Sequence, residues 1–250
     1  MTRGGKWALA LGVLIAFVWS AIATEVSASR IVEGWPFMLD FLRRMVPPDV
    51  SVMGNALRGA LQTLEIAVVG TVTAAVLALP MGFAAARNVA PPWLFYAARS
   101  ILNVFRAVDT LVYALFFVAA VGLGPFPGVL AVVVYTATVL AKLYSEAIEA
   151  IDPGPVEAVK AVGATRLQVL RWGVLPQLGP QFLSFTLYRF ETNIRAAAIL
   201  GFVGAGGIGF YVQTYLRMLD YRAASAVLLV LVALVMLVDF ASSRLRARLI

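Results

Sequence analysis

The 250-residue sequence contains no cysteine and no histidine. Without cysteine there is no disulfide and no thiolate nucleophile, and without histidine there is no imidazole zinc ligand and no Ser-His-Asp triad. Charged residues are also scarce, at 13% of the chain against about a quarter in an average soluble domain. The absence of cysteine and histidine argues against most intramembrane enzymes, and we predict no catalytic residues and no metal site.

Apolar residues make up 62% of the chain, which is more than the interior of a soluble domain of this length could hide. We therefore predict an all-α, polytopic membrane protein surrounded by the lipid bilayer. The net charge of +7 could suggest a nucleic-acid partner. The basic residues are instead scattered at the ends of apolar runs, a pattern that more often sets membrane orientation, so we predict no nucleic-acid partner.

Apolar runs predict about six transmembrane helices within a single domain covering residues 1–250. The expected spans are 7–24, 59–86, 103–122, 129–147, 181–203 and 223–243. With both termini on the cytoplasmic side, twelve Lys and Arg lie inside and six outside, which favours this orientation. Residues 1–24 could alternatively be a cleaved signal peptide, because Ala21-Ile22-Ala23 resembles a cleavage site.

Three further segments carry specific expectations. Apolar residues at helical spacing within 25–58 predict an interfacial helix. The third span is expected to be one helix on which Arg106 and Asp109, three apart, can pair, more simply as a snorkelling arginine with its counter-ion than as a substrate site. We expect residues 211–222 to form a short polar connection before the last span.

A polar segment, residues 148–176, interrupts the apolar runs, and we call it the elbow. Asp152 and Pro153 predict the start of a short helix, and Gly163 its end. Thr165 and Gln168 form a capping-box pattern for a second helix, which Pro176 is expected to end. Such a helix–glycine–helix segment is too polar to cross a bilayer. It is either a docking surface or an ordinary cytoplasmic loop between spans.

The fifth span, 181–203, is unusually polar and holds the candidate transport residues. Two stripes follow from a rotation of about 100° per residue. They comprise Gln181, Ser184, Tyr188, Glu191 and Arg195, and then Thr186, Arg189 and Asn193. Glu191 and Arg195 are four apart and can neutralise each other. The stripes predict either a hydrated pathway partly lined by cations, suited to an oxyanion, or a structural pair that holds two helices together.

A glycine-rich run follows the fifth span. Gly204-Ala-Gly206-Gly207-Ile-Gly209 matches the dinucleotide-binding pattern G-x-G-x-x-G by letter. That site requires a preceding strand and an acid about 20 residues on, whereas here a membrane span precedes the run and Asp220 is too near. We interpret Gly204, Gly206 and Gly207 as positions of close backbone packing or as a gate.

The elbow resembles a loop known from one transporter family. Glu157-Ala158, Gly163-Ala164 and Leu175-Pro176, at these spacings, are similar to the EAA loop of ABC importer permeases. Val159 and Gly173 depart from that pattern, which has alanine and usually isoleucine there. The runs 146–164, 174–197 and 200–209 resemble the phosphonate-type branch, so the resemblance extends over roughly residues 97–209.

The resemblance implies a type I importer permease in the bacterial cytoplasmic membrane, working with two ABC ATPases, an extracytoplasmic substrate-binding protein and a second permease copy. The cargo class it implies is phosphonate or a related oxyanion, phosphate or phosphite. The elbow would dock on the ATPase through Glu157, Ala158, Gly163, Ala164, Leu175 and Pro176. Because the chain has no P-loop, we expect ATP and Mg²⁺ to bind the partner ATPase. An ion-coupled carrier acting alone, with Glu191 as the coupling carboxylate, and a non-transporting anchor are the alternatives.

Overall fold

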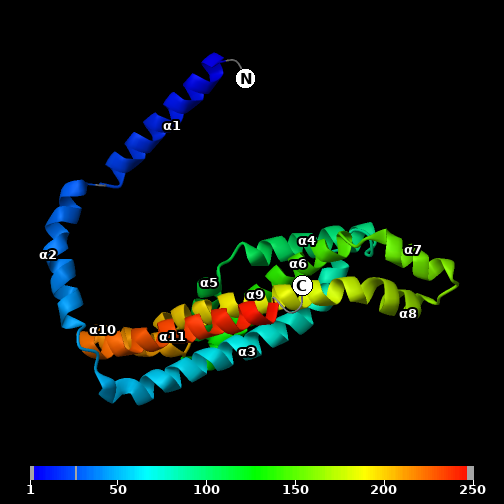
Figure 1. Ribbon diagram of the computed structural model, residues 1–250. Coiled ribbons are helices and arrows are strands. Elements are labelled where there is room, and N and C mark those ends of the chain that lie inside the picture. Colours follow the sequence, from blue (N-terminus) through cyan, green and yellow to red (C-terminus); the bar gives the residue numbers. More distant parts are fainter. Residues whose placement is uncertain (1–2, 26, 247–250) are drawn as a thin grey trace. The chain divides into compact units, whose positions relative to one another are not determined.

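The computed structural model describes residues 3–25 and 27–246. Within these ranges all regular structure is helical and there is no strand, which confirms the predicted all-α class. The chain divides into two compact units, Met1–Val46 and Pro47–Ile250. Each unit is described by itself, and Figure 1 labels the helices of both.

The first unit consists of two helices, α1 (Arg3–Ala23) and α2 (Ala28–Arg44). α2 separates apolar from charged side chains, as a helix lying in a membrane interface does, and it coincides with the interfacial helix expected within 25–58. Arg44 and Asp40 form an exposed ion pair one turn apart on its polar face, 2.8 Å between Nε and Oδ2.

The second unit is a bundle of long helices with short helices at its ends. Its elements are η1 (Val50–Val52), α3 (Met53–Ala84), α4 (Pro92–Arg106), α5 (Thr110–Val121), α6 (Pro125–Glu149), α7 (Pro153–Ala161), α8 (Arg166–Val169), η2 (Leu170–Val174), α9 (Leu175–Leu200), η3 (Gly201–Val203), α10 (Ile208–Arg217) and α11 (Tyr221–Arg246). Four of its helical stretches are long and apolar enough to cross a membrane, namely Val50–Ala84, Pro125–Glu149, Arg166–Arg217 and Tyr221–Arg246. α4 and α5 together add a fifth if that bent pair is one span. In α1, the described apolar stretch Ala10–Ala23 is shorter than a span.

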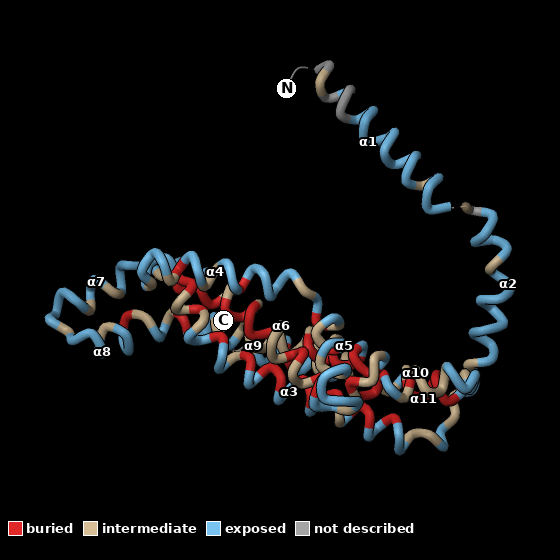
Figure 2. The backbone as a smooth tube through the Cα atoms, turned by 180° about the vertical axis from the view of Figure 1, so that it is seen from behind, coloured by how far each residue is buried: buried red, intermediate tan, exposed pale blue. Residues whose placement is uncertain are grey.

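The core of the bundle lies where α3, α6 and α9 meet. Small residues on α3 let α6 approach closely: a Cβ at Gly70 would lie 2.9 Å from Cβ of Val132, and one at Gly82 would lie 2.9 Å from Cβ of Tyr144. Such contacts are typical of helices that associate in lipid, where packing replaces the hydrophobic effect. Figure 2 shows buried positions concentrated along these helices and exposed positions along their outer faces.

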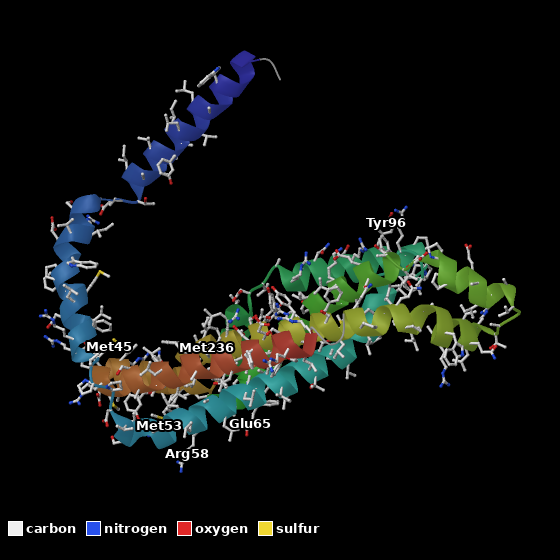
Figure 3. The ribbon with its side chains drawn as sticks, in the orientation of Figure 1. Met45, Met53, Arg58, Glu65, Tyr96 and Met236 are labelled. Atoms are coloured by element: carbon white, nitrogen blue, oxygen red, sulfur yellow. The ribbon has the colours of Figure 1, made fainter. Side chains whose placement is uncertain are left out.

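The outer face of α3 also carries charge. Arg58 and Glu65 are both exposed and point away from the other helices of the second unit (Figure 3). The remaining outer surface is mostly large and apolar, as expected for a surface in contact with lipid tails.

The prediction of one continuous helix over residues 103–122 is wrong. α4 ends at Arg106, and α5 begins at Thr110 after a bend of 81°. Asp109 causes the new start because its side chain accepts a hydrogen bond from the N–H of Leu111 at 2.9 Å, as an N-cap does. Arg106 and Asp109 therefore lie on different helices and form no ion pair in the described part of the chain.

Residues 211–222 are also more ordered than the polar connection expected there. Most of them belong to α10, which buries Ile208 and Val212 one turn apart against α3 and α11. Two side chains of α3 fix its start: Gln62 accepts from the N–H of Gly207 at 2.7 Å, and Thr63 accepts from the N–H of Ile208 at 2.8 Å. These partners are 145 residues away in sequence, so local composition could not indicate the helix.

Candidate functional site

The elbow is a helix–turn–helix that projects from one end of the bundle (Figure 1). Asp152 caps α7 by accepting a hydrogen bond from the N–H of Gly154 at 2.9 Å. The turn after α7 contains Gly163 with a φ of 81°, a left-handed conformation that glycine adopts without strain. Gln168 accepts from the N–H of Thr165 at 2.8 Å at the start of α8. The predicted starts of both helices and the stop at Gly163 are confirmed.

The prediction that Pro176 ends the second helix is wrong. α8 continues through a π-helical turn, η2, into α9, and this helical stretch is long and apolar enough to cross a membrane. Pro176 is the second residue of α9, directly after this turn, and its missing N–H falls where the regular α-helical hydrogen bonding is already interrupted. The second limb of the elbow is thus the beginning of the polar membrane helix.

One side chain closes the base of the elbow. Gln177 accepts a hydrogen bond from the N–H of Asp152 at 3.1 Å, and its amide nitrogen donates to the carbonyl of Asp152 at 3.2 Å and to that of Gly173 at 2.8 Å. Gly173 is buried against α7, and a Cβ there would lie 3.1 Å from Cα of Val156. The glycine that departs from the family pattern therefore lets the two limbs pack closely.

The tip of the elbow is an exposed apolar surface. Val162, Leu167 and Trp172 are 83%, 75% and 63% exposed. A recess of 540 Å³ is lined by Val159, Val162, Gly163, Ala164, Gln168 and Trp172. Of the predicted coupling residues, Glu157, Ala158, Gly163, Leu175 and Pro176 are exposed, and Ala164 is half-buried. Within the described ranges Glu157 has no ion pair, so its carboxylate is available to a partner.

A clamp fixes the membrane end of the elbow, and sequence reasoning missed it. Glu149, the last residue of α6, accepts two hydrogen bonds from Arg99 of α4, at 2.8 and 3.0 Å, and one from the N–H of Arg87 at 2.7 Å. Arg99 also donates to the carbonyl of Ala85 at 3.1 Å. The ends of α3 and α6 and the middle of α4 are thereby held together where the elbow leaves the bundle.

The second polar stripe of α9 lies inside the bundle. Asn193 is 2% exposed, donates to the hydroxyl of Thr71 on α3 at 2.8 Å, and accepts from the hydroxyl of Thr136 on α6 at 3.0 Å. Nearer the elbow, the hydroxyls of Thr186 and Tyr144 are 2.6 Å apart. Asn193 therefore joins three helices, which is a structural arrangement for a residue that was predicted to line the pathway.

Two residues of the first stripe, Glu191 and Arg195, contact α11 and form a four-residue ion network with it. Glu191 and Arg195 are paired at 3.1 Å, as their spacing predicts. Glu191 also pairs with Arg246 at 2.8 Å, and Arg195 with Asp239 at 2.6 Å. Helical spacing gives no signal for pairs between distant spans, so Asp239 and Arg246 could not be found from the sequence. Two acids and two arginines make the network neutral.

Arg189 differs from Arg195 because no acid neutralises it in the described part of the chain. Its Nη2 makes long hydrogen bonds to Asn193 and Thr136, at 3.3 and 3.5 Å, while its buried Nε has no partner there. The guanidinium carbon lies 5.4 Å from the ring centroid of Tyr135 on α6, a cation–π distance. Tyr188, the remaining predicted pathway residue, is 49% exposed.

The glycine run after α9 is a region of close backbone packing, as expected. Gly204, Gly206 and Gly207 have φ values of 84°, 78° and 81°. A Cβ at Gly206 would lie 2.9 Å from Cα of Pro125 at the start of α6, and one at Gly207 would lie 2.8 Å from Oγ1 of Thr63. A gating role for these glycines stays a prediction.

Comparison with known proteins now identifies the family. Residues 78–250 match the model of the family described as "Binding-protein-dependent transport system inner membrane component". The chain belongs to this family. It is a multi-pass membrane protein of the ABC importer permease type, as the elbow predicted.

Relatives of this permease agree with that assignment. It is 42% identical over 243 residues to the phosphite transport system permease protein PtxC of Stutzerimonas stutzeri, covering 97% of this chain and 88% of the relative. It is 41% identical over 219 residues to the phosphate-import permease protein PhnE of Mycolicibacterium smegmatis, covering 86% and 41%. These relatives confirm the resemblance to the phosphonate-type branch.

The fold of the permease has counterparts among solved structures. An inward-facing structure of the MetNI methionine ABC transporter superposes with a TM-score of 0.69 at 26% identity, covering 81% of this chain and 99% of that one. The bundle with its projecting elbow is therefore an ABC importer permease fold.

Proposed function

We propose that this chain is the membrane-spanning subunit of an ATP-driven importer for phosphonate or a related oxyanion such as phosphite or phosphate. The names of its relatives support this cargo class. Two ATPases, an extracytoplasmic binding protein and a second permease copy would complete the assembly, with ATP and Mg²⁺ bound by the ATPases and both termini cytoplasmic. The chain itself would catalyse no reaction.

The continuity of the elbow with α9 is the observation that carries the mechanism. α8, η2 and α9 form one helical stretch, so a displacement of the elbow tip by an ATPase is transmitted directly to the polar membrane helix. Gln177 couples the first limb to the same helix through Asp152. Closure of the ATPases would thus alter how α9 packs in the bundle, which is what alternating access requires.

Reconstitution in proteoliposomes tests the proposal. The chain is co-purified with its ATPase and supplied with its binding protein, and uptake of labelled phosphate, phosphite and methylphosphonate is measured. We expect uptake only with ATP, the ATPase and the binding protein together. Uptake by the chain alone, driven by an ion gradient, would show the ion-coupled carrier instead. ATP-driven uptake that is confined to uncharged solutes would contradict the cargo class.

A further inference from the structure

Two arginines on the same membrane helix have opposite electrostatic surroundings. Arg195 belongs to the neutral network with Glu191, Asp239 and Arg246. Arg189, less than two turns away, has no acid within the described ranges and is half-buried between α9 and α6. Its hydrogen bonds are long, and its Nε has none.

An unpaired arginine is costly in this position. A guanidinium cannot be deprotonated in a protein, so Arg189 cannot avoid the cost by losing its charge. Ionisable groups inside membrane proteins are rare and usually serve a transported ion or a relay. The neutral network shows that this bundle can supply acids to arginines elsewhere, which makes the absence of one beside Arg189 informative.

The surroundings of Arg189 also hold its guanidinium in place. Asn193 donates through its Nδ2 to Thr71, which leaves its Oδ1 turned toward Arg189 and Thr136. The ring of Tyr135 lies beside the guanidinium. The group is therefore oriented by neutral partners while its charge stays uncompensated.

We propose that Arg189 is the intramembrane contact for the transported oxyanion and that Arg195 is not. The proposal rests on the function proposed above and identifies a residue for it. A guanidinium presents a planar fork of donors that matches the oxygens of phosphate, phosphite or a phosphonate. Charge-assisted bonds to such an anion would supply the strong partners that Arg189 lacks. Asn193 acts as a positioning residue that orients the fork.

The test compares matched substitutions in the complete complex, with inorganic phosphate as the probe. The variants are Arg189→Gln, Arg189→Lys and Arg195→Gln, and each is assayed for uptake, for co-purification with the ATPase and for melting temperature. For Arg189→Gln we expect an assembled complex whose melting temperature is equal to or above that of the wild type, and uptake lower by about tenfold or more. Arg189→Lys should retain part of the uptake with a raised KM, because lysine keeps the charge but loses the fork.

Arg195→Gln should behave differently, because it leaves Asp239 without its partner. We expect a lower melting temperature, and uptake per assembled complex close to that of the wild type. Wild-type uptake by Arg189→Gln would overturn the proposal, as would a loss of uptake that only follows a loss of assembled complex. If the wild-type complex transports no oxyanion, the proposed function itself is wrong. That result is distinct from wild-type uptake by Arg189→Gln, which contradicts only the role of Arg189.

Discussion

Gln177 in the first turn of α9 forms a two-way hydrogen-bonded pair with the backbone of Asp152, the residue that caps α7. The pair joins the entry and the exit of the elbow at a single point. Movement of either limb must therefore move the other, and the second limb is continuous with the membrane helix α9. A side chain that fixes geometry in this way should affect coupling more than folding.

Replacing Gln177 by Met removes these hydrogen bonds while keeping the length of the side chain. We expect ATP hydrolysis to continue while oxyanion uptake per ATP falls, because α7 could tilt without carrying α9 with it. The loss of stability should be modest, about 1–3 kcal/mol. Simultaneous measurement of uptake and phosphate release from ATP checks the ratio.

Gln181→Met is the matched control for Gln177→Met. Gln181 lies one turn further along α9 and is exposed. The same chemical change there should leave the ratio of uptake to hydrolysis unaltered. If the ratio of uptake to ATP hydrolysis is the same for Gln177→Met as for Gln181→Met, the hydrogen-bonded pair between Gln177 and Asp152 has no part in coupling.

The clamp between Arg99 and Glu149 should stabilise the end of the bundle from which the elbow leaves. Their side chains are only 28% and 30% exposed. A double-mutant cycle with Arg99→Met and Glu149→Gln should give a coupling energy of about 1 kcal/mol, measured from thermal unfolding of the detergent-solubilised complex.

Lys142 and Glu146 offer a comparison for that cycle. They are four apart on α6, with Glu146 53% exposed, and should couple by only about 0.3–0.5 kcal/mol. A coupling energy for Arg99 and Glu149 that is no larger than this would show that the clamp contributes nothing beyond an ordinary surface pair.

The network between α9 and α11 should depend most on Glu191. This carboxylate is 13% exposed and contacts both Arg195 and Arg246, whereas Asp239 is 38% exposed and contacts Arg195 alone. Glu191→Gln should therefore cost about 1–3 kcal/mol of stability, because it leaves Arg246 without a carboxylate partner and Arg195 with Asp239 alone. Asp239→Asn should cost less. The reverse order of melting temperatures would contradict the burial argument.

Local signals in the sequence predicted local structure well. The caps at Asp152 and Thr165 and the stop at Gly163 are contacts within three residues, and each is confirmed. The glycine run packs closely against Pro125 and Thr63, which agrees with one of its two interpretations, and the gate stays a prediction. The local signals were enough to find the elbow, whereas the family came from the resemblance of residues such as Glu157-Ala158 and Leu175-Pro176 to the EAA loop.

Contacts between distant segments were not predictable from one sequence. Glu149 accepts hydrogen bonds from Arg99, which is 50 residues away in sequence, and Glu191 accepts one from Arg246, which is 55 residues away. The pairing of Arg106 with Asp109 failed for the opposite reason, since a helical spacing was assumed across a break that Asp109 itself creates. Pro176 was interpreted as a stop, although proline is compatible with the first turn of a helix and α8 enters α9 through a π-helical turn.

Gly207 offers a test of the packing at the start of α10. Its φ of 81° disfavours a side chain, and a Cβ would lie 2.8 Å from the hydroxyl oxygen of Thr63, which accepts the N–H of Ile208. The ψ of −175° at Gly207 places it in an extended positive-φ region that is essentially restricted to glycine, so Gly207→Ala should cost about 1–3 kcal/mol in backbone strain alone. Displacement of Thr63 would add to this cost by removing a hydrogen bond at the start of α10.

Gly54→Ala separates this effect from the general effect of adding a methyl group. Gly54 is an exposed residue in the first turn of α3, no atom of another segment would lie within 4 Å of an added Cβ, and its φ is not positive. Alanine there should stabilise the helix by about 0.5–1 kcal/mol. Melting temperatures that move in opposite directions for the two substitutions would locate the strain at Gly207. A fall in both would instead mean that the exposed face around Gly54 is covered in the assembled importer, where a methyl group meets a partner that the single chain does not contain.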